Sequence, residues 1–311
     1  MKKILFMAAM SAMLFSFSGC NNEDEPQRIS EKTADLHVET EISGMPETYA
    51  PLSTFPDGAK LGLFVTPGAI GQNYPIGPYN NALAEFKSGK WVLTPQVKLS
   101  DTPAIIYAYF PYTTSITNAA SVPIYTSNQV DYMFGTNAEG QESVDRSNPN
   151  VRLRMKHALS LLQFKVKKMN YPGEGKLTRV EVLNAQSKYE IVSYGLLNIG
   201  SGEIAYQGQH NPAFVENANG LVTLTEEMPT KEENFVNLMI LPVSKTSANG
   251  SVYLKFIIDG STYYYYIPVN TTFKQGTKNT FNVTLNGTEL TIDDIVITDW
   301  LTGPENSLNL Y

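Results

Sequence analysis

The residue with the clearest chemistry is Cys20, the only cysteine in the chain of 311 residues. It directly follows Phe17, Ser18 and Gly19, and the two small residues leave the backbone extended and open to a peptidase. A thiol in this position can carry a diacylglycerol, so the four residues are typical of a lipobox, with Phe17 where leucine is commoner. The alternative is an ordinary signal peptide in which the cysteine is incidental. Because Cys20 lies where cleavage should fall, the sequence favours lipidation.

The residues before Cys20 have the layout of a secretory signal peptide. Lys2 and Lys3 precede an uncharged apolar run from Ile4 to Phe17. This run is shorter than the roughly 20 residues that cross a bilayer, so it predicts a cleaved signal and not a membrane span. Cleavage before Cys20 removes 19 of the 311 residues and leaves 292. No second long apolar run follows in the sequence.

Other residues that could support catalysis or metal binding are scattered. His37, His157 and His210 show no ligand-like spacing to one another or to a cysteine, so no metal site is expected. The sequence has no phosphate loop, dinucleotide fingerprint or Gly-x-Ser-x-Gly, and no cofactor is expected. The pairs Glu226-Glu227 and Asp293-Asp294 occupy adjacent strand positions, whose side chains point to opposite faces. We therefore predict no catalytic residues and a protein that is not an enzyme.

Tyr263 to Tyr266 form an aromatic run that could contact a ligand. Alternate residues of a strand share a face, so half of these rings could stack on sugars. The alternative, which strand composition favours, is a strand that buries one aromatic face in the core.

The bulk composition limits the function further. Hydrophobic residues make up 42% and charged residues 17%, which is enough to build a core. The net charge of -7 argues against binding to a nucleic acid. With Cys20 lipidated, the mature chain has no disulfide, so its stability must come from core packing.

Short strands separated by Gly, Pro and Asn clusters run through the whole chain, and no stretch shows a sustained helical period. This pattern predicts an all-β fold of sandwiches. Asp259-Gly260 and Asn286-Gly287 predict hairpin turns. Residues 67–78, 113–128 and 136–150 are expected loops. The expected strands are 34–42, 61–65, 91–94, 97–99, 104–110, 131–135, 151–155, 159–166, 177–183, 221–225, 235–243, 252–258, 262–269, 281–285 and 290–298, with interrupted strands in 189–206.

The length suits two domains of ordinary size or one large domain, and the polar stretch 136–150 favours a junction between two domains. The predicted organisation is a signal peptide at 1–19, an acidic flexible tether at 20–33, an N-terminal β-sandwich at 34–150 and a C-terminal β-sandwich at 151–311.

Six short motifs follow one another along the chain: the lipobox, Lys60–Val65, Ala108–Tyr112, Asp131–Phe134, Lys156–Val166 and Ile295–Trp300. In type and order they resemble those of Bacteroidetes fimbrillin-like (Mfa-like) lipoproteins. Each motif alone is weak, but the ordered set covers nearly the whole chain. The acidic cluster that follows Cys20 also resembles the surface-export signal of Bacteroidetes lipoproteins.

The resemblance implies two tandem transthyretin-like (Greek-key) β-sandwich domains and a subunit of a type V-like fimbria, or pilus. The resemblance also implies a lipoprotein that is exposed at the cell surface. In this chain the lipid on Cys20 would hold it in the outer membrane. Such subunits are trimmed by an Arg-specific protease and joined to other fimbrial subunits by a donor strand, which is β-augmentation. The implied role is adhesion to a host or bacterial surface ligand.

Arg28 is the candidate site of proteolytic maturation, and here the chain departs from the family's pattern. No Lys or Arg occurs from Thr33 to Ala59, so cleavage at Arg28 would leave the strand at 36–42 in place. Either the removed strand differs, or this subunit is an uncut anchor or accessory protein.

The candidate donor segment is 290–311, with Ile292, Val296 and Ile297 as the apolar side chains that a neighbour would bury. The alternative is that 290–298 is simply the last strand of the second domain. A further alternative for the whole chain is a surface lipoprotein that binds glycans or host ligands and does not polymerise.

Overall fold

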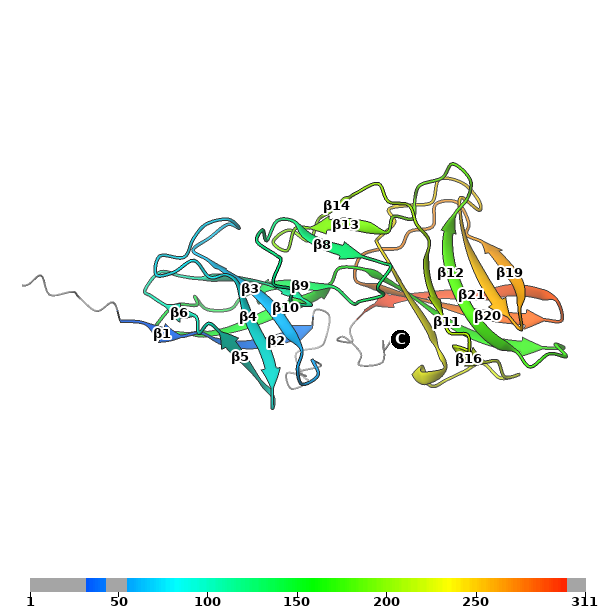
Figure 1. Cartoon of the computed structure of the whole chain (residues 1–311), viewed down its shortest axis with the longest axis horizontal. Helices are drawn as coiled ribbons and strands as arrows, with labels where there is room; N and C mark the ends of the chain where they lie inside the picture. The colour runs from blue at the N-terminus through cyan, green and yellow to red at the C-terminus, as the bar shows by residue number, and fades with distance from the viewer. Residues whose placement is uncertain (1–31, 43–54, 301–311) are drawn as a thin grey trace, which may run out of the picture. The chain divides into compact units, whose positions relative to one another are not determined.

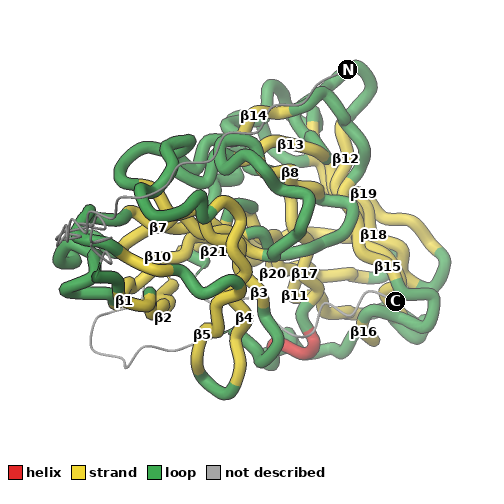
Figure 2. Tube along the Cα trace, turned by 60° about the vertical axis from the view of Figure 1, so that its left-hand side comes forward, coloured by secondary structure: helices red, strands yellow, loops and turns green. Residues whose placement is uncertain are grey.

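The computed structural model describes residues 32–42 and 55–300, so the predictions for Cys20 and Arg28 fall outside the described residues. Strands and loops make up nearly all of this part of the chain, and its single helical element is a 3-10 turn at Glu232–Asn234 (Figure 2). The prediction of an all-β fold is confirmed.

The first half of the chain forms a seven-stranded sheet. All its strand pairs are antiparallel except β2 (His37–Ile42) with β10 (Asn150–His157), which run parallel. A buried core that includes Leu61, Leu63, Ile106 and Leu153 packs on it. A separate short pair joins β1 (Ala34–Asp35) to β6 (Lys98–Leu99). In spatial order the seven strands are β2 (His37–Ile42), β10 (Asn150–His157), β9 (Met133–Asn137), β7 (Ile105–Phe110), β3 (Lys60–Thr66), β4 (Asn80–Lys87) and β5 (Lys90–Thr94).

The second half forms a sandwich of two sheets over one core (Figure 1). Phe164 lies at the centre of this core, with Phe256 of the opposite sheet 5.5 Å away edge-on and Phe281 stacked at 5.1 Å. One sheet consists of β17 (Val236–Ile240), β11 (Ser160–Met169), β20 (Thr277–Asn286) and β21 (Glu289–Asp299). The other consists of β15 (Ala213–Glu216), β12 (Lys176–Asn184), β18 (Val252–Ile258) and β19 (Ser261–Tyr266), with β16 (Val222–Thr223) also beside β12.

A three-stranded sheet joins segments of the two halves. It consists of β14 (Ile204–Tyr206), β13 (Tyr194–Leu197) and β8 (Val122–Tyr125). Gln129 strengthens this junction because its side-chain amide bonds both the N–H and the C=O of Met239, at 2.7 and 3.0 Å. A third core of buried residues from both halves lies here, and it includes Trp300.

Strand β8 corrects one expectation, since residues 113–128 were predicted to be a loop. Val122 and Ile124 are buried and alternate with outward residues, which is the strand period. Pro123 hid this pattern, but proline is tolerated here because β8 is an edge strand. Strands β4 and β15 were also not predicted.

The predicted turns Asp259-Gly260 and Asn286-Gly287 both lie where two paired strands are joined in a hairpin. Ile258 pairs with Ser261, so Asp259 and Gly260 are the central residues, and both have positive φ (47° and 76°). The second hairpin is displaced by one residue, because Asn286 itself pairs with Glu289 and the turn is at 287–288.

Strand β10 begins at the predicted domain boundary, residue 150. It pairs with β9 and β2 in the seven-stranded sheet, so a division drawn by sheets would fall after His157. The division into two domains stays a prediction.

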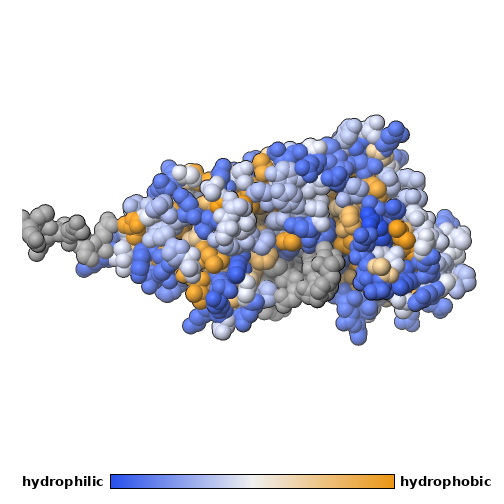
Figure 3. All heavy atoms as spheres, in the orientation of Figure 1, coloured by the Kyte–Doolittle hydropathy of each residue, from blue (hydrophilic) through white to orange (hydrophobic). Residues whose placement is uncertain are grey.

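The face shown in Figure 3 is mostly hydrophilic, with hydrophobic residues scattered over it. Within 32–42 and 55–300, no helix is long and apolar enough to cross a membrane.

Candidate functional site: the terminal strands

The described residues bring together no group of three His, Cys, Asp or Glu side chains that could hold a metal ion. The candidate functional site is therefore sought at the strands that lie at the edges of the sheets. Two strands are relevant to the predicted assembly: β2, the most N-terminal strand of the seven-stranded sheet, and β21, the last described strand.

Strand β21 is an edge strand of the four-stranded sheet and pairs antiparallel with β20 from Asn286–Glu289 to Thr277–Asp299. Of the three predicted donor side chains, Ile292 is half-buried against the core, while Val296 and Ile297 are 46% and 57% exposed. The segment thus lies in its own sheet, with two of its apolar side chains turned to solvent. Whether it also serves as a donor stays a prediction.

An irregularity in the pairing of β21 with β20 decides which of its side chains face the core. The register shifts between Asn282 and Val283, so that Asp293 is skipped, as in a β-bulge. The side chains that pack on the core are Leu290, Ile292 and Ile295. A regular strand alternates strictly, and one extra residue reverses the face of everything that follows it.

Trp300 follows β21 directly and is only 7% exposed. Its indole stacks on the imidazole of His157, with ring centroids 3.9 Å apart and planes within 2°. Its backbone N–H donates a 2.8 Å hydrogen bond to the carbonyl of Gly276. The end of the strand is thus held both by its backbone and by a buried ring.

His157 is itself held by Asp131, because its Nδ1 lies 2.8 Å from the Asp131 Oδ1. Both side chains are almost fully buried. Burial raises the pKa of the Asp131 carboxyl, and the neighbouring His157 partly opposes this shift. The second oxygen, Oδ2 of Asp131, and Nε2 of His157 are buried without a hydrogen-bond partner. In the sequence His157 is an isolated histidine, because its partners Asp131 and Trp300 lie 26 and 143 positions away.

Strand β2 is the other candidate. Leu36, just before it, and Val38 are buried in the first core. On its other face, the Glu41 carboxylate forms ion pairs with the Nε atoms of Arg154, at 2.7 Å, and Arg152, at 3.2 Å. The parallel partner β10 and these charges fix β2 in the sheet.

The tyrosine run divides as a strand requires. Tyr263 and Tyr265 pack partly buried against the core, whereas Tyr264 and Tyr266 are 49% and 63% exposed. The exposed pair lies beside Tyr253 of β18, with ring centroids 5.9 and 6.0 Å from it.

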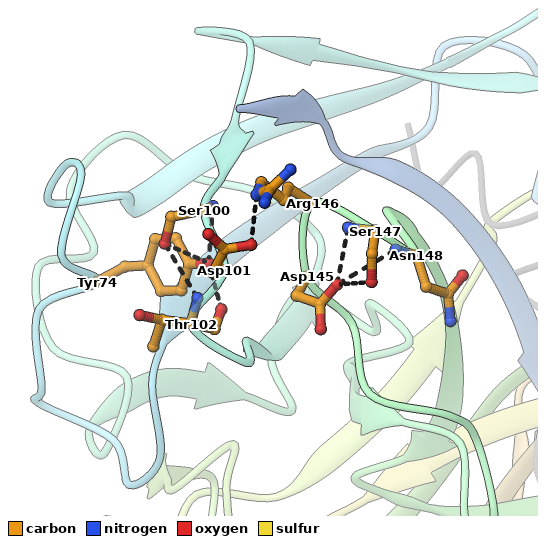
Figure 4. A network of polar contacts seen from close by, with 8 residues as sticks. All are labelled: Tyr74, Ser100, Asp101, Thr102, Asp145, Arg146, Ser147 and Asn148. Carbon is orange, nitrogen blue, oxygen red and sulfur yellow. Dashed lines mark hydrogen bonds and ion pairs between the residues drawn. The ribbon is translucent and has the colours of Figure 1, made fainter. Parts of the chain in front are cut away.

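Arg146 lies in a loop that a polar network fixes (Figure 4). Its side chain faces Asp101 in an ion pair, and its N–H donates to the carbonyl of Ser100 at 2.8 Å. The Asp145 carboxylate accepts hydrogen bonds from the hydroxyl and N–H of Ser147, which lower the pKa of Asp145.

A sequence model of the fimbrillin-like family matches residues 48–300. The chain belongs to the fimbrillin-like family. This membership supports a role as a structural subunit of cell-surface fimbriae and not as an enzyme. No curated protein matches the sequence.

Solved structures share the fold of this fimbrillin-like chain at low sequence identity. A candidate cell adhesion protein from Bacteroides uniformis superposes with a TM-score of 0.63 at 14% identity, covering 86% of this chain and 99% of the other. A second, from Bacteroides ovatus, gives 0.61 at 16% identity over 88% and 99%. A fimbrial protein from Bacteroides vulgatus gives 0.53 at 16% identity over 86% and 99%.

Proposed function

We propose that this fimbrillin-like chain is the precursor of a fimbrial subunit that is anchored in the outer membrane through a lipid on Cys20. In this proposal Arg28 is the site of proteolytic release. Residues 290–311 carry a donor strand that joins the subunit to its neighbours by β-strand complementation. The observation that carries the proposal is the position of β21 at the edge of its sheet.

An edge strand presents unpaired N–H and C=O groups to any extended partner. The sheet order places no other described strand on the outer side of β21. Proteins usually protect such edges with charges, and Asp293, Asp294 and Asp299 have this effect here. Val296 and Ile297, however, lie exposed between them. Contact with a second subunit would cover this exposed apolar pair.

The arginines support Arg28 as the maturation site. The chain has five arginines, and the four in the described residues, Arg146, Arg152, Arg154 and Arg179, all form ion pairs with Asp or Glu. Three of them lie in strands, and the loop of Arg146 is fixed by hydrogen bonds. A protease needs an extended and accessible backbone, so these four are poor substrates.

Cleavage at Arg28 would leave β2 in place. Leu36 and Val38 are buried in the first core, so this strand is part of the folded subunit. In the proposed scheme the cut releases the subunit from its lipid without opening the seven-stranded sheet.

N-terminal sequencing of the protein from cells tests the maturation step. A start at Ile29 is expected for the wild type and a start at Cys20 for Arg28→Ala. Arg146→Ala is the matched control and should be processed normally. If the wild type starts at Cys20, the chain is an uncut anchor or accessory subunit. Cys20→Ala is expected to abolish polymers on the cell surface, as seen by electron microscopy.

Deletion of residues 290–311 tests the donor segment. We expect a secreted, lipidated chain that remains folded and does not assemble. If the truncated monomer unfolds, the segment belongs to its own core, and if it still polymerises, the donor role is wrong.

A second candidate function rests on the exposed face formed by Tyr253, Tyr264 and Tyr266. Tyrosine rings with one open face can stack on sugars, so this face supports a surface protein that binds a neutral glycan. Tyr264→Ala with Tyr266→Ala should abolish binding to a glycan array, while Tyr189→Ala, a 64% exposed tyrosine elsewhere, should not. Equal array signals for the two variants would exclude this face as the binding site.

A further inference from the structure

The outer face of one sheet of the second sandwich carries a straight row of four side chains. The row consists of Phe214 in β15, Glu181 in β12, Lys255 in β18 and Tyr264 in β19, each directly opposite the next (strands in Figure 2). The residues next to them along each strand pack on the core of the sandwich, so the row itself points away from it. Neighbouring strands lie about 4.8 Å apart, so the row spans about 14 Å.

Both ends of the row are aromatic and open to solvent. Phe214 is 38% exposed and Tyr264 is 49% exposed. The guanidinium of Arg179 lies 3.8 Å from the centroid of the Phe214 ring, and this cation–π contact holds the ring in place. Tyr264 lies beside Tyr253, with ring centroids 5.9 Å apart. Each end therefore offers a supported aromatic ring on which a ligand can stack.

Between the two rings lies a polar network that is held by several bonds. The Glu181 side chain is 6% exposed, and its carboxylate accepts two 3.1 Å hydrogen bonds from Arg179. The ammonium group of Lys255 donates another at 3.3 Å, and Arg179 also forms an ion pair with Glu216 in β15. An apolar side chain at position 181 would avoid the cost of desolvating a carboxylate. The network instead holds hydrogen-bonding groups in fixed positions, and arginine and lysine carry further N–H donors for a ligand.

The charges of this network point to an uncharged ligand. Its two cations and two carboxylates cancel, and each of them takes part in an ion pair. A charged ligand would therefore find no unpaired charge here to oppose its own. A neutral sugar matches the row, because its hydroxyl groups bond polar side chains and its apolar C–H face stacks on aromatic rings. A single sugar ring is too short to reach both aromatic ends, so the row suits a chain of sugars.

We propose that this row binds a linear, neutral glycan chain that lies across the strands, with one sugar ring on Tyr264 and a later one on Phe214. The hydroxyl groups between these rings bond to the Glu181 network. This inference rests on the glycan-binding role given above as the second candidate function, and it extends that site from the tyrosines to β15. Sugars joined through equatorial bonds, such as β-1,4-linked glucose, form flat, extended chains that fit an open sheet face.

The length of the bound chain is tested by titration calorimetry with β-1,4-linked glucose oligosaccharides of two, four and six units. We expect the affinity to rise at least about tenfold from two to four units, because only the longer chain reaches both rings. Between four and six units the affinity should change little, because the row ends at Phe214. An affinity that does not depend on chain length would overturn the proposed row.

Variants at the two ends locate the chain. Phe214→Ala should weaken binding of the four-unit chain at least about tenfold and leave the two-unit chain unaffected, because the short chain occupies the tyrosine end. Tyr264→Ala should weaken both. Tyr189→Ala, at a 64% exposed tyrosine elsewhere, is the control and should bind as the wild type does. Thermal unfolding of each variant near the wild-type temperature shows that the sandwich is intact.

The outcomes separate this inference from the function on which it rests. If the tyrosine variants lose binding and Phe214→Ala binds the four-unit chain normally, glycan binding stands and the extended row is wrong. If only sulfated or carboxylated glycans bind, the neutral class is wrong. If the wild type binds no glycan, both the second candidate function and this inference are wrong. A dimer in sedimentation that Phe214→Ala abolishes would then assign the face to a second copy of the chain.

Discussion

Trp91 of β5 donates a hydrogen bond from its indole Nε1 to the hydroxyl of Thr40 in β2, at 3.3 Å, and both residues are buried. These strands are the two ends of the seven-stranded sheet. The bond therefore joins the sheet's two edges across the first core, and it secures β2, the most N-terminal strand of that sheet.

Thr40→Val should destabilise the chain by about 1–3 kcal/mol, because it leaves a buried indole N–H without an acceptor. Thr40→Ser keeps the hydroxyl and is the matched control. Urea unfolding, followed by tryptophan fluorescence, measures the difference. A Thr40→Val chain as stable as Thr40→Ser would show that the bond contributes nothing to the retention of β2.

Gly62 allows the close approach of Tyr109 from the adjacent strand. A Cβ at position 62 would lie 2.0 Å from Cε1 of Tyr109 and 2.6 Å from Oδ1 of Asn81. The Tyr109 hydroxyl donates to that Asn81 oxygen at 2.7 Å, and burial raises the pKa of Tyr109 to about 12. We expect Gly62→Ala to cost about 1–3 kcal/mol through overpacking.

A double-mutant cycle checks this cause. Tyr109→Leu removes the ring that meets the new methyl group, so Gly62→Ala should cost clearly less in that background. If the cost of Gly62→Ala is the same with and without the Tyr109 ring, steric overlap with Tyr109 is not its origin.

Local patterns predicted much of this fold. The alternation in 34–42 and 252–258 and the Asp259-Gly260 turn are properties of a few adjacent residues, and each is found in the structure. The assignment of 159–166 to a strand was also correct, because Leu162, Phe164 and Val166 point into one core.

Pairings between distant segments were not predictable in this way. Strand β2 pairs in parallel with β10, more than 100 residues away, and no local pattern encodes that choice. The same holds for the candidate site. Trp300, His157 and Asp131 meet only because β10 and β21 end beside the same core, so each looks unremarkable in the sequence.

The Glu190 carboxylate gives the chain an acid-sensitive contact. Burial by itself would raise the pKa of Glu190, but hydrogen bonds from the Ser247 hydroxyl (2.6 Å) and N–H (3.1 Å), with smaller contributions from Ser251, lower this pKa to about 2. The folded-state pKa thus lies below the ordinary value of 4.5. The resulting stabilisation is complete above pH 4.5 and is lost as the pH falls towards 2.

Glu190→Gln should therefore flatten the dependence of stability on pH between about 4.5 and 2, with its greatest loss of stability near neutral pH. Glu226→Gln, at an exposed carboxylate, is the control and should keep the wild-type slope. Thermal unfolding at a series of pH values measures both. Parallel curves for wild type and Glu190→Gln would contradict the role of this contact.

Deletion of Asp293 provides the sharpest test of how β21 is held. Asp293 is skipped in the pairing with β20, and without it Leu290, Ile292 and Ile295 follow strict alternation. Every later pair, up to Asp299 with Thr277, keeps its register. The deletion loses the 2.7 Å hydrogen bond from Thr284, so we expect a cost of only about 0.5–1.5 kcal/mol.

Deletion of Thr298 removes one residue from the same strand but after the bulge. It moves Trp300 by one position, away from His157, and turns it to the opposite face. Loss of a buried tryptophan contact costs about 3–5 kcal/mol, so this deletion should be far more damaging than the first. Thermal unfolding measures the two stabilities, and tryptophan fluorescence reports whether the indole remains buried. Equal losses from the two deletions would mean that the chain length between β20 and Trp300 does not determine how the strand is held.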